Sequence, residues 1–213
     1  MMKALVNLAW ALLAGPALAQ PGTADVVATK NGNLLIQPIH HASLILTQAA
    51  LTIYADPVGV DYFKNEKAPD IILITDIHGD HFDIKTIEAV KKDSTLLIVP
   101  QVVADKLPES DKTNMWILKN DEQVTKQGIR IKAIPMYNLP ESPSAMHTKG
   151  RGNGYVLTMG EKNIYISGDT QGIPEMRSLK NIDITFICMN LPYTMDVQEA
   201  ADAVLDFEPK IVY

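Results

Sequence analysis

Short apolar runs separated by polar turns dominate the chain from about residue 33 onward. Runs of about four to eight residues rich in Ile, Val, Leu and Tyr favour strands over helices. Tight turns separate the first three runs, and later runs follow at comparable spacing. The predicted strands are residues 33–39, 43–47, 51–55, 71–74, 95–99, 115–118, 128–135, 154–159, 163–167, 184–189 and 210–213. The last of these is predicted to be buried.

Helical periodicity marks two of the intervening segments. Asp83 is the predicted N-cap of a helix over residues 84–90, which places apolar residues on one face. Asp196 and Glu199 have the spacing of a capping box at the start of another helix. Its apolar positions recur with helical spacing, which predicts a buried face made of Val197, Ala200, Ala201, Val204 and Leu205. Shorter helices are predicted over residues 101–107 and 173–179.

The order of these elements, strands with interspersed helices and no internal repeat, indicates one α/β or α+β domain. The chain has 213 residues, of which 46% are hydrophobic, so it can bury a substantial core. Its formal net charge is −6, and Lys and Arg do not gather into a patch. This distribution argues against a nucleic-acid partner, because such binding depends on clustered positive charge.

Residues 1–19 have the pattern of a cleavable signal peptide. Lys3 supplies a short positive region, an apolar stretch follows, and Ala17-Leu18-Ala19 is an A-x-A cleavage site before Gln20. The apolar stretch is too short to span a bilayer. The alternative to a cleaved signal peptide is a lipid-facing anchor that is never removed. We expect the mature domain to comprise residues 20–213 and to be periplasmic or secreted.

The densest group of chemically active residues follows the predicted strand 71–74. Asp76, His78, Asp80 and His81 fall within six residues, directly after four apolar ones. Unpaired charge beside a buried strand is costly, whereas imidazole and carboxylate groups are ligands for Zn²⁺ and related ions. The alternative is a polar surface loop in which the acidic groups pair with the histidines. The density of the pattern favours a metal site.

This motif resembles the His-x-His-x-Asp-His signature of the metallo-β-lactamase superfamily, and the likeness is greatest to its lactonase-like and zinc-dependent hydrolase members. Later stretches strengthen the resemblance: His147 before Gly150-Arg151-Gly152-Asn153-Gly154, then Ser167-Gly168-Asp169-Thr170, then Leu191-Pro192-Tyr193-Thr194-Met195. The resemblance implies a four-layer αββα sandwich. It does not extend to the antibiotic-resistance β-lactamases, whose second-half motifs differ.

The resemblance also implies a set of ligands for one or two zinc ions, with manganese or iron as possible substitutes. His78 and His147 belong to a first metal position, Asp80 and His81 belong to a second, and Asp169 bridges the two. Asp80 is in addition the catalytic group that orients water and moves its proton. Without the resemblance, His147 could equally be a solvated loop histidine and Asp169 part of an Asx turn.

Two departures from the family pattern stand out. Asp76 occupies the place of the first histidine, so the first position is expected to be altered, weakened or empty, with harder metals somewhat favoured. The family's last ligand is a histidine after the final core strand, to which residues 211–213 correspond. We therefore expect the domain to be truncated at its C-terminus.

Other polar residues are predicted to surround the metals. Asp56 is expected to brace the metal loop. His41, Asn190 and Tyr193 are candidate substrate contacts at strand ends, although His41 could equally be a turn histidine with one hydrogen bond.

The expected function is hydrolysis of a small ester, lactone, amide or phosphodiester by a metal-activated hydroxide in an exported enzyme. Asp76 motivates one alternative, a metal-binding module without turnover. A further alternative is an iron-dependent redox enzyme on the same fold.

Overall fold

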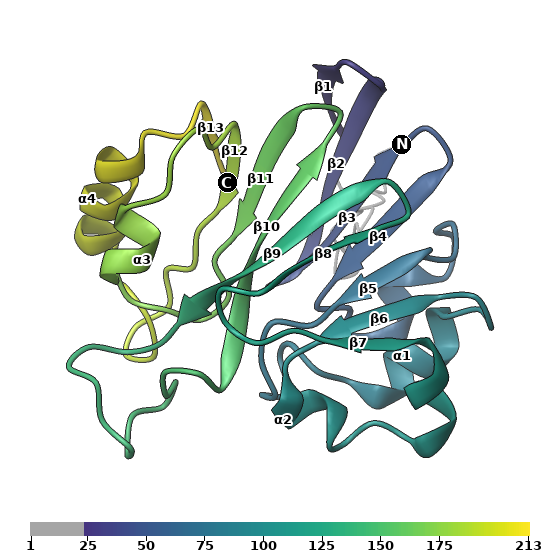
Figure 1. Cartoon of the computed structure of the whole chain (residues 1–213), viewed down its shortest axis with the longest axis horizontal. Coiled ribbons are helices and arrows are strands. Elements are labelled where there is room, and N and C mark those ends of the chain that lie inside the picture. Colours follow the sequence, from purple (N-terminus) through teal and green to yellow (C-terminus); the bar gives the residue numbers. More distant parts are fainter. Residues whose placement is uncertain (1–23) are drawn as a thin grey trace, which may run out of the picture.

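The computed structural model describes residues 24–213 as two β-sheets packed face to face with helices on the outer faces (Figure 1). The predicted signal peptide, residues 1–19, lies outside the described residues. Within the described range, no helix has the length and apolar character needed to cross a bilayer.

The first sheet has seven strands in the order β1-β2-β3-β4-β5-β6-β7. Its first four strands are antiparallel neighbours, whereas β4 to β7 run parallel. The bounds are β1 (Asp25–Thr29), β2 (Gly32–His40), β3 (Ser43–Gln48), β4 (Leu51–Ala55), β5 (Ile71–Leu73), β6 (Leu96–Val99) and β7 (Met115–Ile117).

The second sheet has six strands in the order β13-β12-β11-β10-β9-β8. Strands β8 to β11 pair antiparallel, and β11, β12 and β13 pair parallel. The bounds are β8 (Gln123–Lys126), β9 (Ile129–Met136), β10 (Gly152–Met159), β11 (Lys162–Ile166), β12 (Ile184–Phe186) and β13 (Ile211–Val212).

Helices cover the outer face of each sheet, which gives the four layers α, β, β and α (Figure 1). The first sheet carries α1 (Ile84–Val90) and α2 (Gln101–Ala104), with the 3₁₀ helices η1 (Val60–Phe63) and η2 (Glu109–Asn114). The second sheet carries α3 (Pro174–Arg177) and α4 (Val197–Phe207). The predicted αββα sandwich is therefore confirmed.

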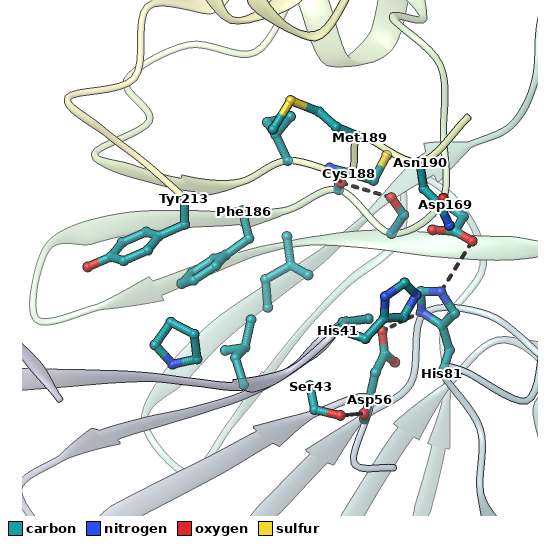
Figure 2. A pocket seen from close by; sticks show the side chains of 17 residues that line it. His41, Ser43, Asp56, His81, Asp169, Phe186, Cys188, Met189, Asn190 and Tyr213 are labelled. Carbon is teal, nitrogen blue, oxygen red and sulfur yellow. Dashed lines mark hydrogen bonds and ion pairs between the residues drawn. The ribbon is translucent and has the colours of Figure 1, made fainter. Parts of the chain in front are cut away.

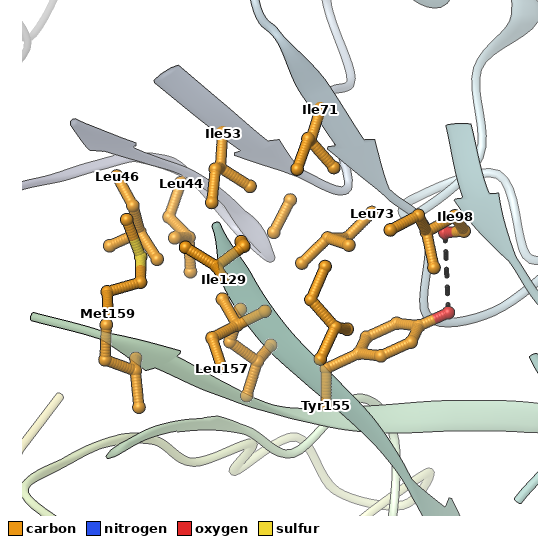
Figure 3. Close-up of a cluster of buried hydrophobic side chains, with 14 of the residues drawn as sticks. Leu44, Leu46, Ile53, Ile71, Leu73, Ile98, Ile129, Tyr155, Leu157 and Met159 are labelled. Carbon is orange, nitrogen blue, oxygen red and sulfur yellow. Dashed lines mark hydrogen bonds between the residues drawn. The ribbon is translucent and has the colours of Figure 1, made fainter. Parts of the chain in front are cut away.

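Strand β5 shows why its sequence is continuously apolar. Ile71 and Leu73 face the core between the sheets, whereas Ile72 and Ile74 pack in the core beneath α1 and α2. All four side chains are fully buried, as expected for a strand covered on both faces. Figure 3 shows the core between the sheets, where side chains of the two sheets interdigitate.

Two strands were not predicted. β8 is mostly polar and β1 is mostly exposed, and each lies at an edge of its sheet, where partly exposed side chains give a weak hydrophobic pattern. All of the predicted strands are present, and their ends differ from the prediction by a few residues.

The predicted buried face of α4 is wrong in part. Val197 and Leu205 are each 72% exposed, whereas the helix buries Ala200, Ala203 and Phe207. The helix does start at Asp196, whose carboxylate accepts a hydrogen bond from the backbone N–H of Glu199 (2.8 Å). The Glu199 side chain instead accepts from the backbone N–H of Gly172 (2.9 Å). That contact ties the helix to the loop before α3.

The prediction of a buried final strand is also wrong for the residues that the structure describes. Strand β13 lies at the edge of the second sheet and pairs with β12. Ile211 and Val212 are 37% and 49% exposed. Apolar side chains on an edge strand do not need to be covered on both faces.

Candidate metal centre

The predicted site residues gather at one edge of the sandwich, where strands of both sheets end. Asp56 follows β4, the segment 76–81 follows β5, and Asp169 follows β11. The carboxyl ends of neighbouring parallel strands meet at one edge of a sheet, which explains why these loops lie together. Figure 2 shows His81 reaching from the first sheet toward Asp169 of the second.

His81 is buried and is held at one ring nitrogen. Its Nδ1 lies 2.8 Å from Asp56 Oδ2 and 3.0 Å from the Thr75 hydroxyl. Burial lowers the pKa of the imidazole, but the Asp56 and Asp169 carboxylates together raise it more, so the pKa of His81 lies well above its ordinary value. A carboxylate at Nδ1 fixes the ring and directs Nε2 outward, an arrangement common behind metal-binding histidines. The predicted bracing contact of Asp56 is therefore present.

Asp56 is itself fully enclosed by donors. Besides His81, it accepts hydrogen bonds from the backbone N–H of Thr75 (2.7 Å) and from the Thr75 hydroxyl (2.6 Å). Burial nevertheless raises the pKa of the Asp56 carboxyl above its ordinary value. The buried Asp56 carboxylate thus holds the His81 ring in position.

The Nε2 atoms of His81 and His147 converge on Asp169. Each lies 3.2 Å from Asp169 Oδ2, yet neither forms a hydrogen bond of acceptable geometry within residues 24–213. Burial raises the pKa of the Asp169 carboxyl, but the two imidazoles outweigh this effect and hold it well below its ordinary value. Two buried imidazole nitrogens that make no hydrogen bond are unusual. Nitrogen and carboxylate oxygen in this arrangement fit a divalent metal ion.

His147 is positioned by the long loop between β9 and β10. Its backbone N–H donates to Asn138 Oδ1 (2.8 Å), and the N–H of Asn138 donates to the carbonyl of His147 (2.9 Å). The Asn138 side chain also donates to the carbonyl of Tyr193 (2.9 Å). Tyr193 therefore meets this loop through its backbone, and its exposed ring does not line the cavity described below.

Asp80 lies nearer to solvent than the other predicted ligands. Its Oδ2 is 3.1 Å from His41 Nε2, and ligand atoms of His41, Asp80 and His81 all lie within 4.8 Å of one another. His41, predicted to contact substrate, thus joins a group that could hold a metal ion. The Asp80 side chain is 47% exposed, so solvent can reach it.

The environment of Asp76 differs from that of a free metal ligand. Asp76 is fully buried, and Arg151 donates to both of its oxygens, from Nε to Oδ1 (3.2 Å) and from Nη2 to Oδ2 (2.7 Å). His78 Nδ1 lies 2.9 Å from Asp76 Oδ2. Asp76, His78 and His147 also form a group whose ligand atoms lie within 4.8 Å of one another. The sequence did not reveal Arg151 as the partner of Asp76. The one available signal was the carboxylate at position 76, which calls for a positively charged neighbour.

The glycines after Arg151 leave room for backbone of the first sheet's motif loop and of the neighbouring strand β11. A Cβ on Gly152 would lie 2.7 Å from the carbonyl oxygen of Thr75, and one on Gly154 would lie 2.8 Å from that of Ser167. Between them, the N–H of Asn153 donates to the carbonyl of Thr75 (2.9 Å). The glycine-rich run therefore brings β10 against the loop that carries the motif.

A cavity of about 440 Å³ opens beside His81 and Asp169. Asn190 and His41, the two predicted substrate contacts at this end, line it together with mostly apolar side chains. Figure 2 shows Phe186, Met189 and Tyr213 around this space.

Comparison with known proteins agrees with this architecture. Residues 35–213 match the family model described as the β-lactamase superfamily domain, so the chain belongs to that family. A crystal structure from Parabacteroides distasonis, described as a metal-dependent hydrolase, is 42% identical, has a TM-score of 0.82, and is matched over 89% of this chain and 86% of that one.

Two curated proteins named metal-dependent hydrolase are also similar. One from Lysinibacillus sphaericus is 30% identical, over 81% of each chain. Another from Thermococcus onnurineus is 28% identical over 69% of this chain, and the match spans 66% of that protein's length. By family and fold, the chain is a metal-dependent hydrolase of the β-lactamase superfamily.

Proposed function

We propose that the protein hydrolyses a small ester, lactone, amide or phosphodiester with the help of bound zinc, after export from the cytoplasm. The observation that carries this proposal is the convergence of two buried, unpartnered imidazole nitrogens, from His81 and His147, on Asp169. Such a donor set suits zinc, and it accepts manganese or iron as well.

The residues of the chain divide the work. His81, His147 and Asp169 would hold the ion, and Asp80 lies within ligand reach of His81. Asp56 keeps the His81 ring in place. When bound, such an ion polarises a carbonyl or phosphoryl oxygen and lowers the pKa of water. Asp80 is solvent-accessible and next to His41, so it can orient the attacking water and accept its proton.

The adjoining cavity supports a small substrate with an apolar part. Its volume of about 440 Å³ is typical of small-molecule sites, and Figure 2 shows His41, His81, Asp169 and Asn190 together at one end of it. Asn190 supplies an amide that can donate to or accept from a substrate oxygen.

The test is hydrolysis of a panel of esters, lactones, amides and phosphodiesters by metal-free protein reconstituted with zinc, manganese or iron. We expect His81→Ala to lower kcat/KM by at least about 100-fold, because it removes a metal ligand. The matched control is His40→Ala, since His40 stacks on Tyr62 (ring centroids 4.8 Å apart) rather than on the site. A metal-loaded protein that cleaves none of the four classes contradicts the proposal and favours a binding module without turnover.

Export has a separate test. The signal pattern of residues 1–19 supports a mature chain that starts at Gln20. Fractionation of the producing cells, with N-terminal sequencing of the product, is expected to place the mature chain outside the cytoplasm. Recovery of an intact Met1 in the cytoplasm contradicts export without affecting the hydrolase proposal.

A further inference from the structure

We infer that the Arg151 guanidinium takes the place of a metal ion at the first position, so that the protein binds one divalent ion, beside Asp169 and His81. This inference rests on the proposed function. It concerns how many ions the site takes and which residue supplies the missing charge.

The contacts of Arg151 use the groups that a first ion needs. Both oxygens of Asp76 already accept hydrogen bonds from this guanidinium, at 3.2 and 2.7 Å. Nη2 also lies 3.5 Å from His78 Nε2, and Nη1 donates to the carbonyl of Met146 (2.6 Å). The side chain is thus held on three sides, within the group formed by Asp76, His78 and His147.

The positive charge of Arg151 opposes binding of a second divalent cation at this position. A guanidinium stays protonated at any pH that a folded protein meets. An ion bound to Asp76 and His78 would lie against the guanidinium in a buried place, where repulsion between like charges is poorly screened. The Asp76 carboxylate is neutralised by the pair and has no further charge to offer.

The ion pair with Arg151 accounts for a carboxylate, rather than an imidazole, at position 76. A neutral imidazole at position 76 could not neutralise a half-buried guanidinium, whereas a carboxylate pairs with it in two-pronged geometry. His147 faces the other side, since its Nε2 is closer to Asp169 Oδ2 (3.2 Å) than to Asp76 Oδ2 (3.8 Å). The unpartnered nitrogens of His81 and His147 therefore lie toward Asp169, where the remaining ion belongs.

Metal stoichiometry tests the inference without any activity measurement. The purified protein is made metal-free, saturated with Zn²⁺ or Co²⁺, freed of excess ion and analysed for metal per chain. We expect about one equivalent for the wild type and about two for Arg151→Met. That substitution removes the positive charge and frees the carboxylate oxygens of Asp76 to bind an ion. The absorption spectrum of the Co²⁺ form should show a second ligand environment in the variant.

Two further variants separate charge from folding. Arg151→Lys keeps a positive charge and is expected to stay at about one equivalent. Lys149→Met removes a positive charge from the same loop, where Lys149 pairs with Glu141 and Glu175, and should also stay at about one. Circular dichroism verifies that each variant is folded. Should Arg151→Met not fold, Arg151→Gln, which also removes the positive charge, takes its place and is expected to bind about two equivalents.

The outcomes distinguish the two proposals. Two equivalents in the wild type overturn the inference about Arg151 and leave the hydrolase proposal standing. No bound metal in the wild type overturns the hydrolase proposal itself. One equivalent in the wild type and also in folded Arg151→Met shows that the guanidinium does not exclude the ion, and it overturns the inference.

Discussion

Asp56 contacts the candidate metal centre through another residue, His81. It lies behind His81, accepts a hydrogen bond at 2.8 Å from the ring, and is enclosed by Thr75. An imidazole held this way would need little reorganisation to bind an ion. The contribution of Asp56 should therefore appear in metal affinity rather than in the shape of the cavity.

We expect Asp56→Asn to weaken metal binding by about 10- to 100-fold, because the amide cannot stabilise the same tautomer of His81 as strongly. Competition with a chelating dye measures the change. Asp70→Asn is the matched control, since Asp70 pairs with Lys92 and caps the N–H of Thr52 at the opposite end of β5. Equal affinity for wild type and Asp56→Asn would show that Asp56 does not orient the ligand.

At the scale of single elements, helix α4 shows that the hydrophobic pattern of a helix does not by itself tell which residues are buried. Phe207 packs edge-on against Tyr165, with ring centroids 6.0 Å apart, and is almost fully buried. Leu205 has comparable hydrophobicity but is exposed. The helix docks on the second sheet through small residues, Ala200 and Ala203, which allow a close approach.

The two positions should differ sharply in stability. Phe207→Ala is expected to lower the free energy of unfolding by about 3–4 kcal/mol, because it leaves a cavity beside Tyr165. Leu205→Ala should change it by less than about 0.5 kcal/mol. Urea unfolding of the two variants measures both values. A larger loss for Leu205→Ala would place the wrong face of α4 against the sheet.

Asp183 joins three neighbouring strands of the second sheet at the start of β12. Its carboxylate accepts from the backbone N–H of Asn163 (3.0 Å) and pairs with Lys210 (2.7 Å) and Lys162 (3.3 Å). Burial raises the pKa of Asp183, but these donors outweigh it and the pKa lies below its ordinary value. A depressed pKa in the folded state stabilises the protein above the unfolded-state pKa, and the contribution is lost as the pH falls through the folded-state value.

Asp183→Asn should therefore lower stability at pH 7 by about 1 kcal/mol, a modest figure because both lysines are partly exposed. The difference from wild type should shrink as the pH falls below about 3.9, where the unfolded carboxyl becomes protonated. Urea unfolding of the metal-free proteins across this range measures the trend. A difference independent of pH would show that the charge of Asp183 contributes nothing.

At the scale of the whole molecule, the candidate metal centre joins the two sheets. His81 and Asp56 belong to loops of the first sheet, whereas Asp169 and His147 belong to loops of the second. Elsewhere apolar side chains fill the space between the sheets, and polar links include the Tyr155 hydroxyl, which donates to the carbonyl of Ile74 (2.9 Å). A bound ion would therefore connect the halves of the sandwich.

Zinc at about 100 times its dissociation constant should raise the free energy of unfolding by about 2.7 kcal/mol, and chelation should reverse the effect. Thermal unfolding with and without zinc measures it. The zinc-dependent shift should be lost in His81→Ala and kept in His40→Ala. An identical midpoint for wild type in saturating zinc and in chelator would mean that the folded state binds no ion preferentially.

The order and type of most elements follow from local pattern. The run Ile71–Ile74 predicts a strand buried on both faces, and Asp83 and Asp196 mark helix starts that the structure confirms through their hydrogen bonds. These features depend on neighbours in the chain, so the sequence states them directly. Edge strands such as β1 and the buried face of α4 depend on partners distant in sequence, and there the local pattern was insufficient.

The sequence by itself determined the fold class and, through its motifs, the residues that converge at the edge of the sandwich. Only the tertiary structure decided what Asp76 faces. Arg151 lies 75 residues away along the chain, and packing of β10 against the loop after β5 brings the two together. Pairing energy depends on distance in space and on burial, and neither is written in the spacing of residues along a chain.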